Sequence, residues 1–378
     1  MTVPHIRDYQ GKRIHMIGIG GSSMSGLAQM LKEKGYIVSG SDNLETYTTR
    51  HLRDDLHIPV TIGHRAENVH GADLVVYTVA ILPDNPERVE LERLGLPSIE
   101  RATLLGQLME GFDTAIGVCG AHGKTTTTSL IYHIFKKAGY NVGLAGNIGQ
   151  SLALQVAEKN YDYYVIELSS FQLDNMYRFR ANIAVLLNIT PDHLDRYDNC
   201  MQNYVDAKMR ILQNQEETDA FVYWNDDPII QRELKKYDIK AKMCPFSILK
   251  KEGMIGYLAD GQYVIEYPTP FNMEQESLAL TGKHNMYNSL AAGITADLAG
   301  IKNEVIRQSL SDFEGVEHRL EKVVRVRGVD YVNDSKATNV DACWYALESM
   351  KTPTVLILGG KDKGNDYNAI AELVRKKC

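Results

Sequence analysis

The sequence predicts an α/β protein whose domains contain parallel sheets. Apolar, strand-like runs alternate with helical patterns over most of the 378 residues, and this alternation is typical of helix-covered parallel sheets. Two glycine-containing loops, at residues 17–26 and 117–125, each follow a strand-like run and precede a helical stretch. Loops of this kind at helix N-termini bind phosphate groups. We therefore expect a nucleotide-binding α/β protein.

The composition narrows the class of protein. Hydrophobic residues make up 44% of the chain and charged residues 24%, as in ordinary globular proteins. The net charge of −7 argues against a general nucleic-acid binder. The N-terminus has no apolar signal segment, and no apolar run approaches the ~18 residues of a membrane span, so neither export nor membrane insertion is expected. The chain is expected to be cytoplasmic.

The cysteine pattern supports that location. Five widely spaced cysteines without CxxC pairs fit free thiols in a reducing compartment and no structural zinc. One of them, Cys119, lies inside the second glycine-containing loop. We interpret it as a small buried filler, with a reactive thiol as the alternative.

The length suggests two or three domains, and the pattern of elements favours three. We place the first at residues 1–110, the second at 111–317 and the third at 318–378. A helix is expected at 23–34 and an antiparallel insertion at 256–268. Strands are expected at 13–19, 37–41, 74–78, 163–167, 183–188, 221–224, 329–333 and 354–359.

The loop at residues 117–125 carries the strongest functional signal. Its end, Gly123-Lys124-Thr125, matches the end of a nucleoside-triphosphate phosphate loop. In such loops the lysine reaches the β- and γ-phosphates and the hydroxyl binds Mg²⁺. The general pattern would have a glycine at Val118, so a chance Gly-Lys-Thr remains the alternative reading.

The first glycine-containing loop suggests a second nucleotide site. Gly18, Gly20, Gly21 and Ser22 stand where a tight turn lets a diphosphate approach a helix N-terminus. Asp42 ends the next expected strand, where an acid meets a ribose or a base edge. A nicotinamide-dinucleotide fingerprint would need glycine at Ser23, so the diphosphate of another nucleotide is favoured. Glycines that serve only helix–strand packing are the remaining alternative.

Acidic and histidine side chains follow strands of the second domain. Glu167 ends one apolar strand, and His193 follows the strand at 183–188. If these strands are neighbours, both side chains lie at one carboxyl edge, where with Thr125 they form a site suited to Mg²⁺ or Mn²⁺. Lys208 lies in a helical stretch and, taken alone, is a solvated lysine.

Several strings resemble the Mur ligases, the ATP-dependent ligases of peptidoglycan synthesis. The second and third domains resemble the D-glutamate-adding members, whereas residues 15–26, 61–68 and 80–87 resemble the L-alanine-adding members. The strings that carry the resemblance to D-glutamate-adding members include GAHGKTT at 120–126, GNIG at 146–149, ELSSFQL at 167–173, NITPDH at 188–193, GKHNMYN at 282–288 and NDSKATN at 333–339.

The resemblance implies a three-domain architecture and specific residue roles. It implies catalytic roles for Lys124, Lys208, His193 and Lys336, with Lys208 carbamylated so that it supports a second Mg²⁺. The metal ligands would be Thr125, Glu167, His193 and the carbamate. ATP would contact Gly120, Gly123, Lys124, Thr125, Thr126, Asn285, Asn288, Arg319 and Asp334. The substrates would contact Gly18, Gly20, Gly21, Ser22, Asp42, Asn147, Lys336, Thr338 and Lys363.

The implied activity is an ADP-forming amide ligase that uses ATP and two Mg²⁺ ions to add D-glutamate to UDP-N-acetylmuramoyl-L-alanine through an acyl phosphate. L-alanine addition to UDP-N-acetylmuramate is an alternative. The chain ends at Cys378 within a helical pattern, so we expect an incomplete third domain. A nucleotide- and UDP-sugar-binding protein without turnover is therefore a further alternative. A folylpolyglutamate synthase is disfavoured by the first domain.

Overall fold

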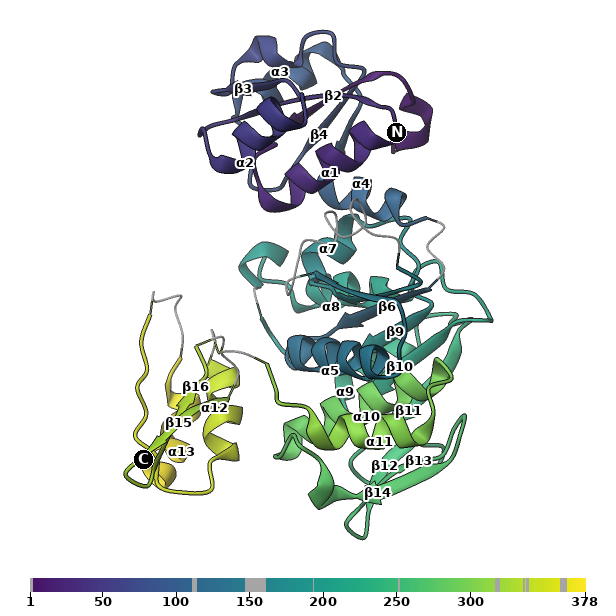
Figure 1. Ribbon diagram of the computed structural model, residues 1–378, viewed down its shortest axis with the longest axis vertical. Coiled ribbons are helices and arrows are strands. Elements are labelled where there is room, and N and C mark those ends of the chain that lie inside the picture. Colours follow the sequence, from purple (N-terminus) through teal and green to yellow (C-terminus); the bar gives the residue numbers. More distant parts are fainter. Residues whose placement is uncertain are drawn as a thin grey trace.

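The computed structural model describes residues 3–110, 114–146, 161–192, 194–250, 252–316, 320–335, 337, 340–360 and 366–378. These residues form three sheets of five, nine and two strands (Figure 1). Within the same ranges, none of the helices combines the length and apolar character that crossing a bilayer requires.

The first sheet is parallel, with strand order β3-β2-β1-β4-β5. Side chains of its central strand, β1, point alternately into two cores. Ile14 and Met16 pack with helices α1 and α4, whereas Ile17 packs with Leu91 of α3 on the other face. The order reverses between β1 and β4, which makes a crevice at their carboxyl ends. The bounds are β1 Arg13–Ile17, α1 Ser22–Glu33, β2 Ile37–Asp42, β3 Val60–Ile62, β4 Leu74–Tyr77, α3 Pro86–Leu94, β5 Ser98–Glu100 and α4 Arg101–Leu108.

The second sheet has the order β14-β13-β12-β11-β10-β9-β6-β8-β7. Strands β6 to β12 are parallel, and β12, β13 and β14 form an antiparallel extension. The strand bounds are β6 Thr114–Cys119, β7 Val142–Gly146, β8 Tyr163–Glu167, β9 Ile183–Leu186, β10 Ala220–Trp224, β11 Lys242–Phe246, β12 Gly256–Ala259, β13 Gln262–Ile265 and β14 Phe271–Glu274.

Helices cover both faces of the second sheet (Figure 1). One core contains α5 (Lys124–Lys137), α10 (Lys283–Leu298) and α11 (Asn303–Asp312). The opposite core contains α7 (Ser170–Asn175) and α8 (Met201–Met209), and it continues through α4 into the first sheet. Shorter elements are η1 Ile6–Tyr9, α2 Tyr47–Arg50, η2 His51–Asp55, η3 Ala66–Val69, η4 Leu194–Tyr197, η5 Arg210–Leu212, α9 Pro228–Leu234 and η6 Gln275–Ser277.

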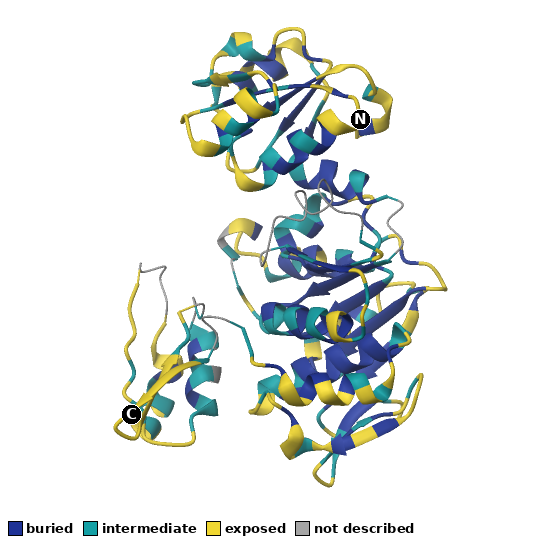
Figure 2. Cartoon of the chain, viewed as in Figure 1, coloured by how far each residue is buried: buried dark blue, intermediate teal, exposed yellow. Residues whose placement is uncertain are grey.

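The third sheet is a hairpin of β15 (Glu321–Val326) and β16 (Val329–Asn333), followed by α12 (Val340–Ser349) and α13 (Asn368–Lys377). Its small core consists of Cys343, Leu347 and Ile370. Figure 2 shows that most of this part is exposed, in contrast to the second sheet.

The prediction of one strand in the third part is wrong. Residues 354–359 are not in a sheet, and Val355 and Ile357 are 92% and 94% exposed. A strand needs a neighbouring chain to complete its hydrogen bonds, and among the described residues β15 and β16 pair only with each other.

Candidate nucleotide and metal site

The loop between β6 and α5 has a backbone that requires glycine. Gly120 and Gly123 have φ values of 155° and 81°, and a side chain at Gly123 would collide with the Asn288 amide. The loop ends at the first residue of α5, Lys124, so the N-terminus of that helix faces the loop. This is the arrangement expected of a phosphate-binding loop.

Asn188 holds this loop in place, and the sequence interpretation did not single it out. Its Oδ1 accepts the N–H groups of Ala121 and His122 at 3.1 and 2.8 Å, and its Nδ2 donates to the His122 carbonyl at 3.0 Å. The residue lies two positions after the buried end of β9. A polar residue after an apolar strand is the signal that could have identified it.

Two lysines converge on one backbone carbonyl. The Nζ atoms of Lys124 and Lys208 both donate to the Gly120 oxygen at 2.8 Å, and Lys124 also donates to the Ala121 oxygen at 2.7 Å. Lys124 comes from α5 and Lys208 from α8, on opposite faces of the sheet. They therefore bring two cationic groups to the edge of the sheet that carries the loop.

The reading of Lys208 as a solvated lysine is wrong. The residue is only 2% exposed, and its Nζ lies 4.5 Å from the centre of the Tyr204 ring. Burial is the main cause that lowers the pKa of Lys208 to about 8; Cys119 and Asp192 oppose this shift, and the charge of Lys124 adds to it. The amine is therefore neutral in a large share of molecules at mildly alkaline pH. Cys119 itself is fully buried.

Thr125 and Glu167 form the described part of the expected metal site. The Thr125 hydroxyl donates to Glu167 Oε2 at 2.9 Å, and both residues are 4% exposed. A hydroxyl and a carboxylate are oxygen ligands of the kind that Mg²⁺ prefers. Among the described residues, no three His, Cys, Asp or Glu side chains group as a metal site.

The expectation that β8 and β9 are adjacent strands is wrong. Strand β6, which carries the phosphate loop, pairs with both and separates them. Glu167 therefore lies beside the loop on one side, and the segment after β9 lies on the other. The predicted site residues Asn147, His193, Arg319, Lys336, Thr338 and Lys363 lie outside the described residues.

The start of α10 is bound tightly to α5. Thr127 Oγ1 donates to Asn288 Oδ1 at 3.2 Å, and Asn288 Nδ2 donates to Asn285 Oδ1 at 3.2 Å. Asn288 is 1% exposed. These contacts place the two asparagines beside Gly123 at the phosphate loop.

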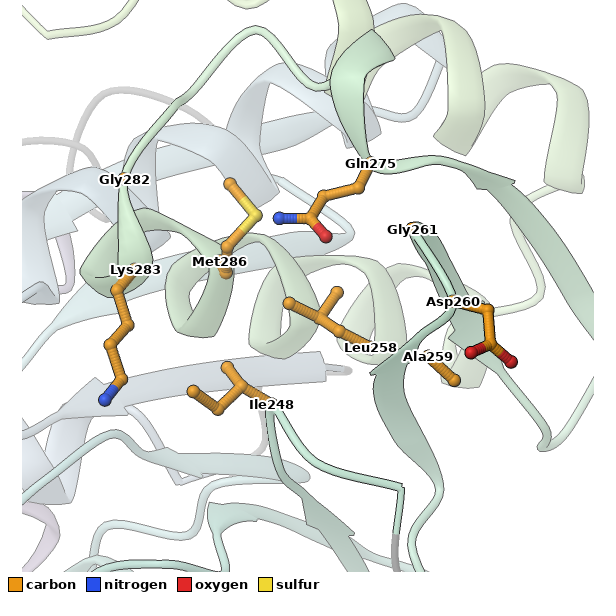
Figure 3. Close-up of a pocket in the computed structure, with 9 residues that line it drawn as sticks. All are labelled: Ile248, Leu258, Ala259, Asp260, Gly261, Gln275, Gly282, Lys283 and Met286. Carbon is orange, nitrogen blue, oxygen red and sulfur yellow. The ribbon is translucent and has the colours of Figure 1, made fainter. Parts of the chain in front are cut away.

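A hollow of about 390 Å³ lies beside the same end of α10. Figure 3 shows Gln275, Leu258 and Met286 lining it, with Lys283 at one side. Met286 is two residues from Asn288, which corresponds to opposite faces of a helix. The hollow is therefore not formed by the predicted nucleotide-binding residues.

The first sheet carries the other predicted loop. Gly18 has a φ of 79°, and the Gly20 N–H donates to Asp42 Oδ2 at 2.9 Å. A Cβ at Gly20 would lie 2.6 Å from Thr49 Cγ2 and 2.9 Å from that same oxygen. Gly21 is the N-cap of α1 and Ser22 its exposed first residue. Asp42 therefore orders the loop from the end of β2.

The first sheet also contains a buried polar cluster, centred on Glu87 of α3, that the sequence interpretation missed. The Glu87 carboxylate accepts hydrogen bonds from Ser41 at 2.8 Å and Asn68 at 2.8 Å, and it contacts His15 at 3.0 Å and His64 at 2.9 Å. Burial alone would raise the pKa of Glu87, but these four hydrogen bonds outweigh it and lower the pKa to about 2. Its position in the first turn of a helix capped by Asn85 was the available signal.

In the third part, Asp334 lies at the end of β16. Its Oδ1 accepts the Leu320 N–H at 3.2 Å, and its carbonyl accepts the Ala337 N–H at 2.9 Å. Asp334 thus joins the beginning of the hairpin to the segment that leads to α12. The third part also approaches the second near Gly282, since a Cβ at Gly282 would lie 3.6 Å from Ser349 Cβ.

Comparisons with known proteins agree with this geometry. A model described as the Mur ligase family catalytic domain matches residues 13–113, and one described as the Mur ligase middle domain matches residues 118–296. UDP-N-acetylmuramoylalanine–D-glutamate ligases from Bacteroides fragilis and Bacteroides thetaiotaomicron are 61% and 59% identical over 371 and 369 residues. Each alignment covers 97% of this chain and 82% of the relative.

Solved structures agree as well. The UDP-N-acetylmuramate:L-alanyl-γ-D-glutamyl-meso-diaminopimelate ligase from Neisseria meningitides has a TM-score of 0.60 and 25% identity, over 81% of this chain and 99% of that one. The UDP-N-acetylmuramate–alanine ligase from Thermotoga maritima has a TM-score of 0.58 and 26% identity, over 89% of this chain and 77% of that one. Similarity at this level, over most of both sequences, establishes that the chain belongs to the Mur ligase family.

Proposed function

We propose that this chain is an ATP-dependent, ADP-forming amide ligase that joins D-glutamate to UDP-N-acetylmuramoyl-L-alanine in peptidoglycan precursor synthesis. The observation that carries the proposal is the phosphate loop between β6 and α5, with Glu167 bonded to Thr125 beside it. The 61% identity to a D-glutamate ligase over nearly the whole chain supports this acceptor.

The chemistry has two steps. In the first, a carboxylate oxygen of the muramoyl peptide bonds to the γ-phosphorus of ATP, the bond from that phosphorus to the β–γ bridging oxygen breaks, and ADP leaves. In the second, the D-glutamate amine bonds to the acyl carbon, phosphate leaves and the amine loses a proton. The first step brings two anions together, so Lys124 must turn from its loop carbonyls toward the phosphates to offset their repulsion.

We assign residues 1–110 to the UDP-sugar, 111–317 to ATP and 318–378 to the amino acid. Gly18, Gly20, Gly21, Ser22 and Asp42 hold the UDP-sugar. Gly120, Gly123, Thr126, Asn285, Asn288, Arg319 and Asp334 hold ATP, and Asn147, Lys336, Thr338 and Lys363 complete the substrate site. Because all five cysteines are free thiols, we place the reaction in the reducing cytoplasm.

The metal assignment follows from the donor atoms. Thr125 and Glu167 fit Mg²⁺, and the family resemblance adds His193. Bound Mg²⁺ would neutralise charge on the phosphate oxygens. The Lys208 amine lies beside the same loop, and its lowered pKa of about 8 favours the neutral form that reacts with carbon dioxide. We therefore propose that Lys208 is carbamylated and that the resulting anion supports a second Mg²⁺.

The test is release of phosphate from ATP in two mixtures. One contains UDP-N-acetylmuramoyl-L-alanine and D-glutamate, and the other contains UDP-N-acetylmuramate and L-alanine. We expect release only in the first mixture, and none from Lys124→Ala. Lys136→Ala, at the far end of the same helix, is the matched control and should keep wild-type activity.

Two other results would change the assignment. Release only in the second mixture would make the chain an L-alanine ligase, the alternative that its similarity to the Thermotoga maritima enzyme favours. No release in either mixture, with ATP and the UDP-sugar both bound, would make it a binding protein without turnover.

A further inference from the structure

Arg101 reaches across the first sheet to the glycine-containing loop. It is the first residue of α4 and directly follows β5, yet its Nη1 donates to Ser23 Oγ at 2.9 Å. Ser23 is the second residue of α1, immediately after the loop. The two residues are 78 positions apart, so this contact exists only in the folded protein.

The strand order places this contact over the crevice of the sheet. Strand β4 lies between β5 and β1, so the Arg101 side chain passes the carboxyl end of β4 to reach the start of α1. Helices α1 and α4 pack in the same core, on the same face. The crevice between β1 and β4 is where the order reverses, and ligands of open α/β sheets bind at such points.

The start of α1 has no acidic group within the helix, although the Asp42 carboxylate binds the Gly20 N–H of the loop before it. Its N-cap, Gly21, offers no side-chain hydrogen bond, and its first turn contains no acidic residue. Helix α3 of the same sheet differs, because Asn85 caps it and Glu87 stands in its first turn. The first N–H groups of α1 therefore favour an anion supplied from outside the helix.

Among the described residues Arg101 forms no salt bridge, although it lies close enough to the adjacent Glu100 for its charge to lower the pKa of that carboxyl against the larger effect of burial. Arg53 of this sheet contacts Glu45 and Asp54, and Arg93 contacts Glu90. Arg101 is half-buried, and its guanidinium donates to a neutral hydroxyl. The Glu100 carboxylate accepts backbone N–H groups, that of Ala102 at 2.7 Å among them. A partly desolvated guanidinium that forms no salt bridge is stabilised when an anion binds beside it.

We propose that Arg101 binds the diphosphate of the UDP-sugar, together with the N-terminus of α1. This inference rests on the proposed function and adds a binding residue to its UDP-sugar site. The guanidinium presents several N–H donors in one plane and matches two phosphate oxygens at once. Ser23 holds it in that orientation, which explains a serine where a dinucleotide fingerprint has glycine.

The experiment compares UDP with uridine by titration calorimetry. Arg101→Gln should weaken UDP binding by about 10- to 100-fold, since it removes hydrogen bonds to a charged group. Uridine, which has no phosphate, should bind the variant and the wild type equally. Arg101→Lys keeps the charge but loses the planar fork, so its UDP affinity should lie between the two.

Arg93→Gln is the matched control, because Arg93 is a surface arginine of α3, a helix that packs on the same sheet, and it pairs with Glu90. It should bind UDP as the wild type does. The UDP affinity of the wild type should also fall more steeply with salt than that of Arg101→Gln.

The outcomes separate this inference from the proposed function. Unchanged UDP affinity in Arg101→Gln would overturn the role of Arg101, while phosphate release by the wild type would leave the ligase assignment intact. An equal loss of UDP and uridine binding would mean that Arg101 only holds the sheet together, and would also overturn the proposal. A wild type that binds no UDP would overturn both.

Discussion

At the residue scale, the loop between β6 and α5 binds the Lys124 amine, the cation that we propose acts on ATP. Lys124 donates to two loop carbonyls, and one of these also accepts Lys208. Two positive charges near one carbonyl are unfavourable unless an anion is close or one amine is neutral. In the proposed reaction ATP supplies the anion for Lys124, and the lowered pKa of Lys208, about 8, allows the neutral form of the second amine.

We predict that Lys208→Ala lowers phosphate release by on the order of 100-fold or more, because it removes an electrostatic group from a water-poor site. Bicarbonate should restore wild-type enzyme that has been depleted of carbon dioxide, and more fully above pH 8 than at pH 7. It should not restore the variant, whereas short carboxylic acids should. If the variant kept wild-type activity, Lys208 would have no role in catalysis and would contribute only to packing.

The Glu87 cluster predicts a pH-dependent stability. Because the folded-state pKa of about 2 lies below the ordinary 4.5, the carboxylate stabilises the protein above pH 4.5, and this contribution is lost as the pH falls toward 2. The shift corresponds to about 3 kcal/mol in the free energy of unfolding. Glu87→Gln should therefore unfold at lower urea than the wild type at pH 7, with a gap that narrows between pH 5 and pH 3.

Far-UV circular dichroism measures this gap. Glu92→Gln on the same helix is the control, because Glu92 is largely exposed and its contact with Arg88 is 3.9 Å long. A gap that stays constant with pH would mean that shape, rather than charge, makes Glu87 important.

At the element scale, each nucleotide loop is held by a strand other than the one it follows. The loop after β1 is ordered by Asp42 from β2, and the loop after β6 is held by Asn188 after β9. The carboxyl ends of parallel strands meet at one edge, so side chains from one strand end can bind the loop of the next.

Gly20→Ala tests this arrangement in the first loop. The added methyl group would press on Thr49 and Asp42, so we expect a loss of about 1–3 kcal/mol in stability and weaker UDP binding. Gly21→Ala is the control for stability, because its Cβ would meet only the Gly18 oxygen at 3.5 Å. Thermal unfolding should separate the two variants. Equal melting temperatures would contradict the close packing at Gly20.

At the scale of the whole molecule, the first two sheets share one core through α4, whose Gly106 packs against Met176. The third part has only a small core of its own. Its apolar residues Val355 and Ile357 are almost fully exposed, and an exposed, unpaired apolar segment favours association between chains.

We expect the chain to self-associate as its concentration rises, and the double variant Val355→Lys with Ile357→Lys to remain monomeric. Sedimentation velocity measures this directly. Thr352→Lys, an exposed polar neighbour, should behave as the wild type does. UDP binding should be the same in all three proteins. A wild type that stays monomeric throughout would refute the prediction.

Helices and strands can be predicted well from the local sequence pattern, because that pattern involves only consecutive residues. The expected strands at 163–167 and 329–333 coincide with β8 and β16, and the expected antiparallel insertion at 256–268 contains the antiparallel pair β12 and β13. The phosphate loop was recognisable for the same reason, since Gly123, Lys124 and Thr125 are adjacent in the chain. The sequence by itself thus determined the fold class, the positions of the two glycine-containing loops and the family.

Only the tertiary structure decided which elements are neighbours. It placed β6 between β8 and β9, buried Lys208 against the loop, and brought Arg101 to Ser23 and Glu87 to two histidines. None of these pairings has a local signal, because strand order depends on how each crossover packs on the sheet rather than on the residues within a strand. Burial and charge environment follow from that packing, so the chemistry of Lys208, Glu87 and Arg101 could be read only from the folded chain.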